Sequence, residues 1–252
     1  MESSMINSSQ HDELNCEKGN ELVKSLTSQG YWHSRGKENK DKWIFFDETV
    51  WLKFTSFWDD LLLDKYMGDG GRYRYRRYSQ FNYNNDTRAV NLLKHEAYQQ
   101  SQMANYLNGG FKRYYEPIEE QFLSNHFFIS FIEWLGNAYS KVTGHSQWNV
   151  KLHPYRIRAD IEKGQPSPEG IHRDGVDFVC TFMIRKCNAV GGETVITDNQ
   201  KNPITRLTME NPCDIVVGND NATMHGVSSV SAINPDKPCA YRDVLVVAFA
   251  KI

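Results

Sequence analysis

The stretch Gly170-Ile-His-Arg-Asp-Gly-Val-Asp-Phe-Val-Cys-Thr-Phe-Met-Ile-Arg185 decides the fold that we expect for this chain of 252 residues. It follows a turn signal, Gly164-Gln-Pro-Ser-Pro168, and it is apolar on both faces from Asp177 to Arg185. An apolar run of this length between turns is typical of a strand that is buried on both sides. We therefore expect a strand inside a sheet here.

Short strands are also expected on both sides of this stretch. Trp148, Val150 and Leu152 alternate with more polar residues, and Ile215–Val217 and Val244–Phe249 are rich in β-branched and apolar residues. Turns containing Gly, Asn or Pro separate these runs. Short strands at such spacing predict a β-sandwich or barrel in the second half of the chain.

The first half has a more helical pattern. Apolar residues between Ile118 and Ser140 recur near helical spacing, which predicts the longest helix, with Gly144 just beyond it. A short helix is expected from Leu22 to Gly30, whereas Lys42–Phe57 is aromatic and β-branched and indicates strand or mixed structure. Helices followed by strands predict the α+β class.

Composition narrows the classes of protein. The 29 basic and 31 acidic side chains give a net charge of −2, which argues against binding nucleic acid or an anionic membrane. The five cysteines include no CxxC pair, and the first twenty residues lack the apolar core of a signal peptide, so we expect a cytoplasmic protein. Aromatic residues form 13% of the chain. We expect many of them to pack the first half against the sheet.

His172, Asp174 and His225 are the candidate metal ligands. On an extended segment, residues i and i+2 point to the same face, so His172 and Asp174 can share one ion. His225 follows 53 residues later, after enough strands for the chain to return across a sandwich. Two histidines and one carboxylate form the facial triad that suits non-haem Fe(II) and leaves coordination positions open. The alternative is that His172 is a hydrogen-bonded structural histidine, because a bare His-x-Asp is a weak signal.

Arg242 is the second candidate, at the start of the last predicted strand. Val244, Val246 and Ala248 share its face and are all apolar, so the guanidinium is expected to be partly buried and to need an anion. An acidic cosubstrate or an internal Asp or Glu could each supply that anion.

These residues carry a resemblance to a known family. Four segments resemble the 2-oxoglutarate-Fe(II) dioxygenase family that includes bacterial L-isoleucine 4-hydroxylases: Pro168-Glu-Gly-Ile-His-Arg-Asp-Gly-Val-Asp-Phe178, Gly191-Gly-Glu-Thr194, Thr223-Met-His-Gly-Val-Ser228 and Tyr241-Arg-Asp-Val-Leu-Val246. Upstream, Leu63–Arg72 and Arg76-Arg-Tyr78 are also similar to it. The resemblance extends from Leu63 to Phe249.

The resemblance implies a double-stranded β-helix, a cupin-like jelly roll, with helices of the N-terminal half packed on it. It implies that His172, Asp174 and His225 hold Fe(II) and that Arg242 binds the cosubstrate 2-oxoglutarate. The expected reaction hydroxylates an aliphatic C–H of a free, isoleucine-like L-amino acid, while 2-oxoglutarate and O2 become succinate and CO2. Many relatives have Ser or Thr where this chain has Val244, so a second anchor for 2-oxoglutarate is not identified.

Two further arginines are candidates for the substrate. Arg76 lies in Arg72–Tyr78, which interleaves basic and aromatic residues; it could bind an amino-acid carboxylate or belong to a solvated or paired strand. Arg158 is expected on the face of Val150 and Leu152, beside the metal. His153 and His145 are interpreted as structural.

The expected organisation is a mobile tail over residues 1–20 and a single catalytic domain over residues 21–252. Within that domain, residues 21–145 are expected to be rich in helix and residues 146–252 to supply most strands of the jelly roll. The same chemistry on a peptide, a carrier-tethered amino acid or another small metabolite is an alternative function. A non-enzymatic, cupin-like sensor of a metal or metabolite is a more distant one. The oligomeric state is left open.

Overall fold

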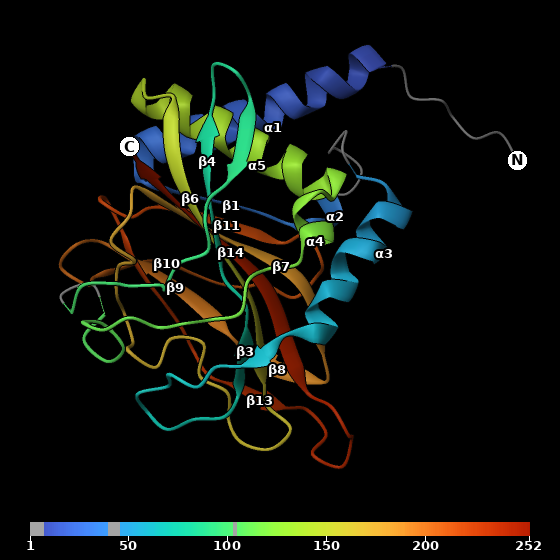
Figure 1. The fold of residues 1–252 in the computed structure, drawn as a ribbon, viewed down its shortest axis with the longest axis vertical. Helices are drawn as coiled ribbons and strands as arrows, with labels where there is room; N and C mark the ends of the chain where they lie inside the picture. Colours follow the sequence, from blue (N-terminus) through green and yellow to red (C-terminus); the bar gives the residue numbers. More distant parts are fainter. Residues whose placement is uncertain (1–7, 40–45, 103–104) are drawn as a thin grey trace, which may run out of the picture.

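A computed structural model describes residues 8–39, 46–102 and 105–252 of the chain, with side chains from residue 17 onward (Figure 1). Its helices are α1 (Ser8–Gln29), α2 (Gly36–Asn39), α3 (Glu48–Ser56), the 3-10 helix η1 (Phe57–Asp60), α4 (Glu120–Leu123) and α5 (His126–Thr143). Its strands are β1 (Tyr31–Ser34), β2 (Leu62–Leu63), β3 (Arg74–Arg76), β4 (Ser79–Asn84), β5 (Ala89–Leu92), β6 (Gln147–Arg158), β7 (Phe178–Cys187), β8 (Ala189–Gly191), β9 (Glu193–Thr197), β10 (Pro203–Thr208), β11 (Ile215–Asn219), β12 (Met224–Val227), β13 (Val230–Ala232) and β14 (Tyr241–Lys251).

The strands form one large and two small antiparallel sheets. The large sheet has nine strands in the order β1-β11-β7-β14-β6-β3-β2, with β4 paired to β6 and β5. The small sheets have the orders β10-β9-β12 and β13-β8. Apolar side chains of β7, β11 and β14 pack with those of β9 and β10, so the large sheet faces the three-stranded one. The α+β class is therefore confirmed.

The other face of the large sheet is covered by helices. Helices α1, α3 and α5 cover this face (Figure 1). Their side chains form one apolar core with those of β6, β7, β11 and β14. Tyr139 on α5 stacks on Phe178 of β7 with 4.3 Å between ring centroids, and it contacts Phe249 of β14 edge-on. The expected packing of aromatic residues between the first half and the sheet is confirmed.

Helix α5 differs from its prediction at the start and agrees at the end. It begins at His126, where the side chain of Asn125 accepts a hydrogen bond from the N–H of Phe127, and α4 precedes it as a separate turn. It ends at Gly144, whose φ of 71° is left-handed and suits glycine. Helix α1, with 22 residues, is longer than α5 with 18, so the prediction of the longest helix was wrong.

The N-terminal region is also more helical than expected. Helix α1 begins at Ser8, whereas the sequence pattern indicates a helix only from Leu22. Lys18 is buried, with its ammonium group 3.0 Å from Glu21 and 3.3 Å from the hydroxyl of Ser34 on β1. This tertiary contact holds a polar segment that has little to bury. Residues 1–7 of the expected tail lie outside the described residues, and the mobility of the tail stays a prediction.

Two further parts of the first half differ from the pattern that the sequence indicates. The expectation of strand or mixed structure for residues 42–57 fails at α3, where Trp51 and Phe54 lie three residues apart and both face the core; residues 42–45 lie outside the described residues. The front half also supplies β1–β5 to the large sheet, so helices and strands are not divided at residue 145. None of the helices described here is long and apolar enough to span a bilayer.

Candidate metal centre and its pocket

The backbone brings the two candidate histidine ligands together. His172 lies in the loop before β7, and His225 lies on β12. The N–H of each donates to the carbonyl oxygen of the other, at 2.9 Å from His172 and 3.0 Å from His225. Their ring centroids are 4.6 Å apart. At Gly226, an added Cβ would lie 3.1 Å from the carbonyl oxygen of Gly170, so glycine permits this close approach of the loop.

Asp174 completes the group that the sequence predicts. One ligand atom from each of His172, Asp174 and His225 lies within 4.8 Å of the others. Oδ2 of Asp174 lies 3.5 Å from Nε2 of His225. The group is partly buried, and its side chains come from a loop and a strand that the backbone fastens together. This donor set could hold a metal ion and still leave positions open for other ligands.

Hydrogen bonding and burial prepare the imidazoles as ligands. Nδ1 of His172 lies 2.9 Å from the carbonyl oxygen of Gly170, so it donates there and leaves Nε2 free for a metal. Burial lowers the pKa of His225 to about 4, and the neighbouring His172 acts in the same direction. Burial acts to lower the pKa of His172 too, but Asp174 and Glu169 raise it.

Asp220 holds the loop that carries Asp174. Its carboxylate accepts hydrogen bonds from the N–H groups of Asp174, Gly175 and Val176 at 3.1, 2.8 and 3.1 Å. It is buried, and burial together with the charge of Asp174 raises its pKa to about 6. Asp220 was not among the residues predicted from the sequence. Its position in the turn Gly218-Asn-Asp-Asn221, just before the strand of His225, was the feature that could have indicated it.

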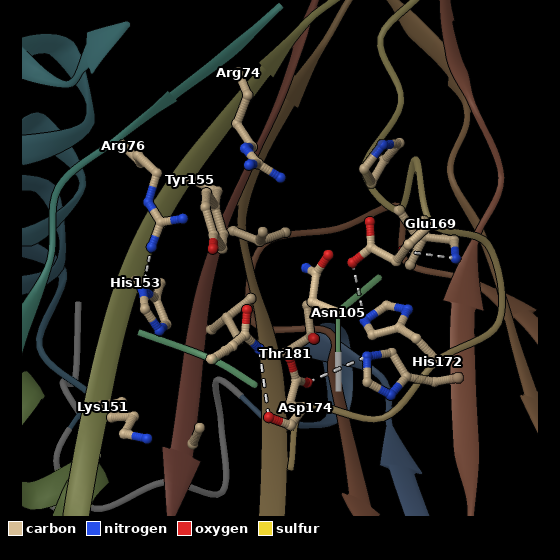
Figure 2. A pocket seen from close by; sticks show the side chains of 18 of the residues that line it. Arg74, Arg76, Asn105, Lys151, His153, Tyr155, Glu169, His172, Asp174 and Thr181 are labelled. Carbon is tan, nitrogen blue, oxygen red and sulfur yellow. Dashed lines mark hydrogen bonds and ion pairs between the residues drawn. The ribbon is translucent and has the colours of Figure 1, made fainter. Parts of the chain in front are cut away.

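A pocket opens beside the triad, with an empty volume of about 920 Å³ that is partly open to solvent. The triad, Arg76 and Arg242 all line it, as the sequence predicts. Figure 2 shows Arg74, Arg76 and His153 on one side of the pocket and Glu169, His172 and Asp174 on the other. The pocket lining that sequence reasoning missed includes Tyr98, Asn105, Arg113, Lys151, Tyr155, Glu169 and Thr181.

Arg242 is a buried cation without a carboxylate partner of its own. It is 2% exposed, and its Nε and one terminal nitrogen have no hydrogen-bond partner in the described part of the chain. The adjacent Asp243 points to the other face of β14, where it pairs with Arg156 and Arg185 at 2.8 Å each. Burial lowers the pKa of Arg242 to about 10. Gly192 allows the backbone to approach the arginine, because an added Cβ would lie 3.2 Å from its Cδ.

A second cationic region lies around Arg76. Arg74 and Arg76 share the single carboxylate of Asp64, at 2.8 and 3.8 Å. Arg76 also contacts Nδ1 of His153, and burial, followed by the charge of Arg76, lowers the pKa of His153 well below its ordinary value, so this histidine is neutral. Arg113 bonds the amide oxygen of Gln100 at 2.9 Å.

The charges in this region do not balance. Nε of Arg76 and Nε of Arg113 are buried without a partner among the described residues. Three guanidinium groups, of Arg74, Arg76 and Arg113, line this side of the pocket, and one carboxylate, of Asp64, pairs with the first two. Buried cations in excess favour the binding of an anion from outside.

The structure places Arg158 outside this pocket. Arg158 pairs with Asp160, with 2.9 Å between its Nε and Oδ1, and it lines a separate cavity with Tyr73 and Tyr75. The prediction chose the wrong face of β6, because Val150 and Leu152 pack against the helices. The odd-numbered positions of the strand line the pocket instead: Lys151, His153, Tyr155 and Ile157.

Comparison with known proteins identifies the class. Residues 55–248 match the 2OG-Fe dioxygenase family, and the chain belongs to this family. It is therefore an oxidoreductase whose family uses Fe(II), 2-oxoglutarate and O2. No curated protein matches the chain.

Solved structures support the same fold. A bsmA homolog from Methylobium petroleophilum PM1 is 27% identical, with a TM-score of 0.84, covering 92% of this chain and 93% of its own. IDO from Bacillus thuringiensis is 19% identical, with a TM-score of 0.75 and coverage of 93% and 99%. The Fe(II)/(alpha)ketoglutarate-dependent dioxygenase TqaL is 16% identical, with a TM-score of 0.76 and coverage of 98% and 91%. The predicted double-stranded β-helix is confirmed.

The residues present fit the cofactors of the family. Two imidazoles and one carboxylate are a donor set suited to Fe(II). Two nitrogens of Arg242 have no partner within the described ranges, so its guanidinium fits a carboxylate, the group at each end of 2-oxoglutarate.

Proposed function

We propose that this enzyme hydroxylates an aliphatic C–H of a free L-amino acid, with isoleucine as the first candidate. His172, Asp174 and His225 hold the iron in this proposal, and Arg242 binds the distal carboxylate of 2-oxoglutarate. When bound, the iron and 2-oxoglutarate supply the oxidation by O2 that converts a C–H to C–OH, with succinate and CO2 as the other products.

The cationic region around Arg76 is the observation that supports an amino acid as the substrate. One unpaired arginine, Arg242, is enough for 2-oxoglutarate. The buried Nε atoms of Arg76 and Arg113 remain, and they line the same pocket. A carboxylate on the second substrate satisfies them, and guanidinium groups suit carboxylates because they can donate two parallel hydrogen bonds. We therefore assign this carboxylate to Arg76, which the sequence predicts as a substrate residue, and to Arg113.

The apolar lining favours an aliphatic side chain. Val176, Val227, Val244 and Val246 line the pocket together with the triad. These side chains exclude water from one wall and offer no hydrogen bond to a polar substrate group. An aliphatic side chain of the substrate can therefore pack against them while its carboxylate reaches the arginines. The protein then orients the substrate and keeps water from the oxidised carbon.

The alternative substrates satisfy these groups less well. A carrier-tethered amino acid has a thioester in place of its carboxylate, so it leaves Arg76 and Arg113 without an anion. A peptide offers a free carboxylate only at its C-terminal residue. Another small carboxylic acid remains compatible with the arginines alone.

The test is a turnover assay after anaerobic loading with Fe(II) and 2-oxoglutarate. Oxygen is admitted in the presence of each free L-amino acid, and succinate and the mass of the amino acid are measured. We expect one aliphatic amino acid to gain 16 mass units, while its C-terminal amide gives little product. The proposal is wrong if no amino acid raises succinate above the level without substrate, or if the amide is as good a substrate as the acid.

A further inference from the structure

Glu169 is a buried carboxylate at the edge of the metal centre. Its side chain is 9% exposed, and Oε1 lies 3.4 Å from Nε2 of His172. Its other oxygen, Oε2, is buried and has no hydrogen-bond partner within the described residues. Figure 2 shows the carboxylate pointing into the pocket, on the side opposite Arg76. An ionised carboxylate in this position needs a partner.

A His172 that binds a metal cannot donate a hydrogen bond to Glu169. Nδ1 of His172 already donates to the carbonyl oxygen of Gly170, so Nε2 is the nitrogen available to a metal. A ligating Nε2 carries no proton and cannot donate to Glu169. In the metal-loaded protein, the described residues therefore leave both oxygens of Glu169 without a donor.

The cations of the pocket do not replace this partner. No ion pair with Glu169 is formed by the arginines and lysine that line the same pocket: Arg74, Arg76, Arg113, Lys151 and Arg242. Glu169 is also not part of the group whose ligand atoms lie within 4.8 Å of one another. A cation or N–H donor that enters the pocket from outside would supply this partner.

We propose that Glu169 binds the α-ammonium group of the substrate. This inference rests on the proposed function, in which the substrate is a free amino acid with its carboxylate at Arg76 and Arg113. An ammonium ion donates short, charge-assisted hydrogen bonds to a carboxylate, and both charges are then satisfied away from water. Because the carboxylate and ammonium groups are recognised on opposite sides of the pocket, the site selects zwitterions.

This assignment predicts which acids the enzyme rejects. A 2-hydroxy acid has nearly the same shape as the amino acid but carries no positive charge. It satisfies Arg76 and Arg113 and leaves Glu169 without a cation. An N-acetyl amino acid fails for the same reason and is also larger. The 2-hydroxy acid is therefore the sharper probe of Glu169.

The experiment measures binding without turnover. Protein loaded with Mn2+ and 2-oxoglutarate under anaerobic conditions is titrated by calorimetry with L-isoleucine and with its 2-hydroxy analogue. We expect wild type to prefer the amino acid by roughly 30-fold or more, the range for truncating one partner of a buried charge pair. Glu169→Gln should bind the amino acid and the hydroxy acid with about equal affinity. Its affinities for the hydroxy acid and for Mn2+ should equal those of wild type. Glu38→Gln, on the exposed surface of α2, is the control.

Each other outcome overturns the inference. If Glu169→Gln keeps the wild-type preference, Glu169 does not bind the ammonium group, and the proposed function stands. If Glu169→Gln weakens Mn2+ binding, Glu169 supports the metal instead. If wild type binds no amino acid from a full panel, the proposed function fails and this assignment fails with it. Should Glu169→Gln unfold, Glu169→Asp replaces it and is expected to retain part of the preference, whereas complete retention contradicts the inference.

Discussion

The main chains of His172 and His225 bond to each other in both directions, with N–O distances of 2.9 and 3.0 Å. The pair fastens the loop that carries two predicted ligands to the strand that carries the third. Asp220 reinforces this loop through three backbone N–H groups. The backbone therefore holds the candidate ligand positions in place.

Removal of the metal should leave the fold intact. Because backbone hydrogen bonds hold the loop, we expect the chelated protein to keep a cooperative thermal transition and native near-ultraviolet circular dichroism. Adding Mn2+ should raise Tm as its concentration exceeds Kd, since the ion binds the folded state. Loss of the cooperative transition on chelation would show that the metal is needed to organise the site.

Replacement of His225 by Ala should remove metal binding and turnover together. Two ligands remain, and neither comes from β12. We expect no Mn2+-induced rise in Tm and no succinate production above background. His145→Ala is the control, because His145 lies outside the pocket and bonds the carbonyl oxygen of Ile252. Full activity in His225→Ala would refute the triad.

Replacement of Asp220 by Ala should weaken metal binding without removing a ligand. The change leaves three N–H groups of the Asp174 loop without their acceptor. Loss of an outer partner of a ligand typically lowers metal affinity about 10- to 100-fold. Titration with Mn2+ measures this change, and an unchanged Kd would show that the loop is held by other contacts.

Replacement of Arg242 by Met should have opposite effects on stability and on cosubstrate binding. The wild-type guanidinium is buried with two nitrogens unpartnered in the described structure, so its loss should raise the apo free energy of unfolding by about 1 kcal/mol or more. The same change should remove the stabilisation of the protein by 2-oxoglutarate. Urea unfolding with and without 2-oxoglutarate measures both effects. Retained stabilisation by 2-oxoglutarate would assign its carboxylate to another residue.

Replacement of Arg113 by Gln should weaken the second substrate alone. We expect the KM for the amino acid to rise about 10-fold or more, because one buried donor to its carboxylate is lost, while the KM for 2-oxoglutarate stays the same. Arg158→Gln is the matched control, because Arg158 pairs with Asp160 outside the pocket. Equal effects of the two variants would contradict a carboxylate site at Arg113.

Replacement of Thr194 by Val tests a second anchor for 2-oxoglutarate. The hydroxyl of Thr194 is buried without a partner among the residues described. Thr194 lines a second cavity that shares Thr181, His225 and Val227 with the pocket of Arg242. If it donates to 2-oxoglutarate, the KM for this cosubstrate should rise about 5- to 10-fold, and the KM for the amino acid should not change. An unchanged KM for 2-oxoglutarate leaves Arg242 as the sole anchor proposed.

Some features of the site were predictable because they depend on local geometry. Strand alternation correctly places Arg242 with Val244, Val246 and Ala248 in the lining of one pocket. The i, i+2 spacing correctly places His172 and Asp174 near one another. The same rule failed on β6, because alternation separates two faces but does not say which one the helices cover. The apolar face of Val150 and Leu152 packs on the helices, and the polar face lines the pocket.

The sequence by itself determined the α+β class and predicted three candidate ligand positions and the arginine at the start of the last strand. Each of these follows from residue type and from spacing along one segment or in an ordered set of motifs. Only the tertiary structure showed that Nε of Arg76 and Nε of Arg113 are buried without a partner among the described residues, and that Glu169 lies 3.4 Å from His172. The free-energy cost of a buried charge depends on whether its neighbours pair with it, and those neighbours come from distant segments of the chain.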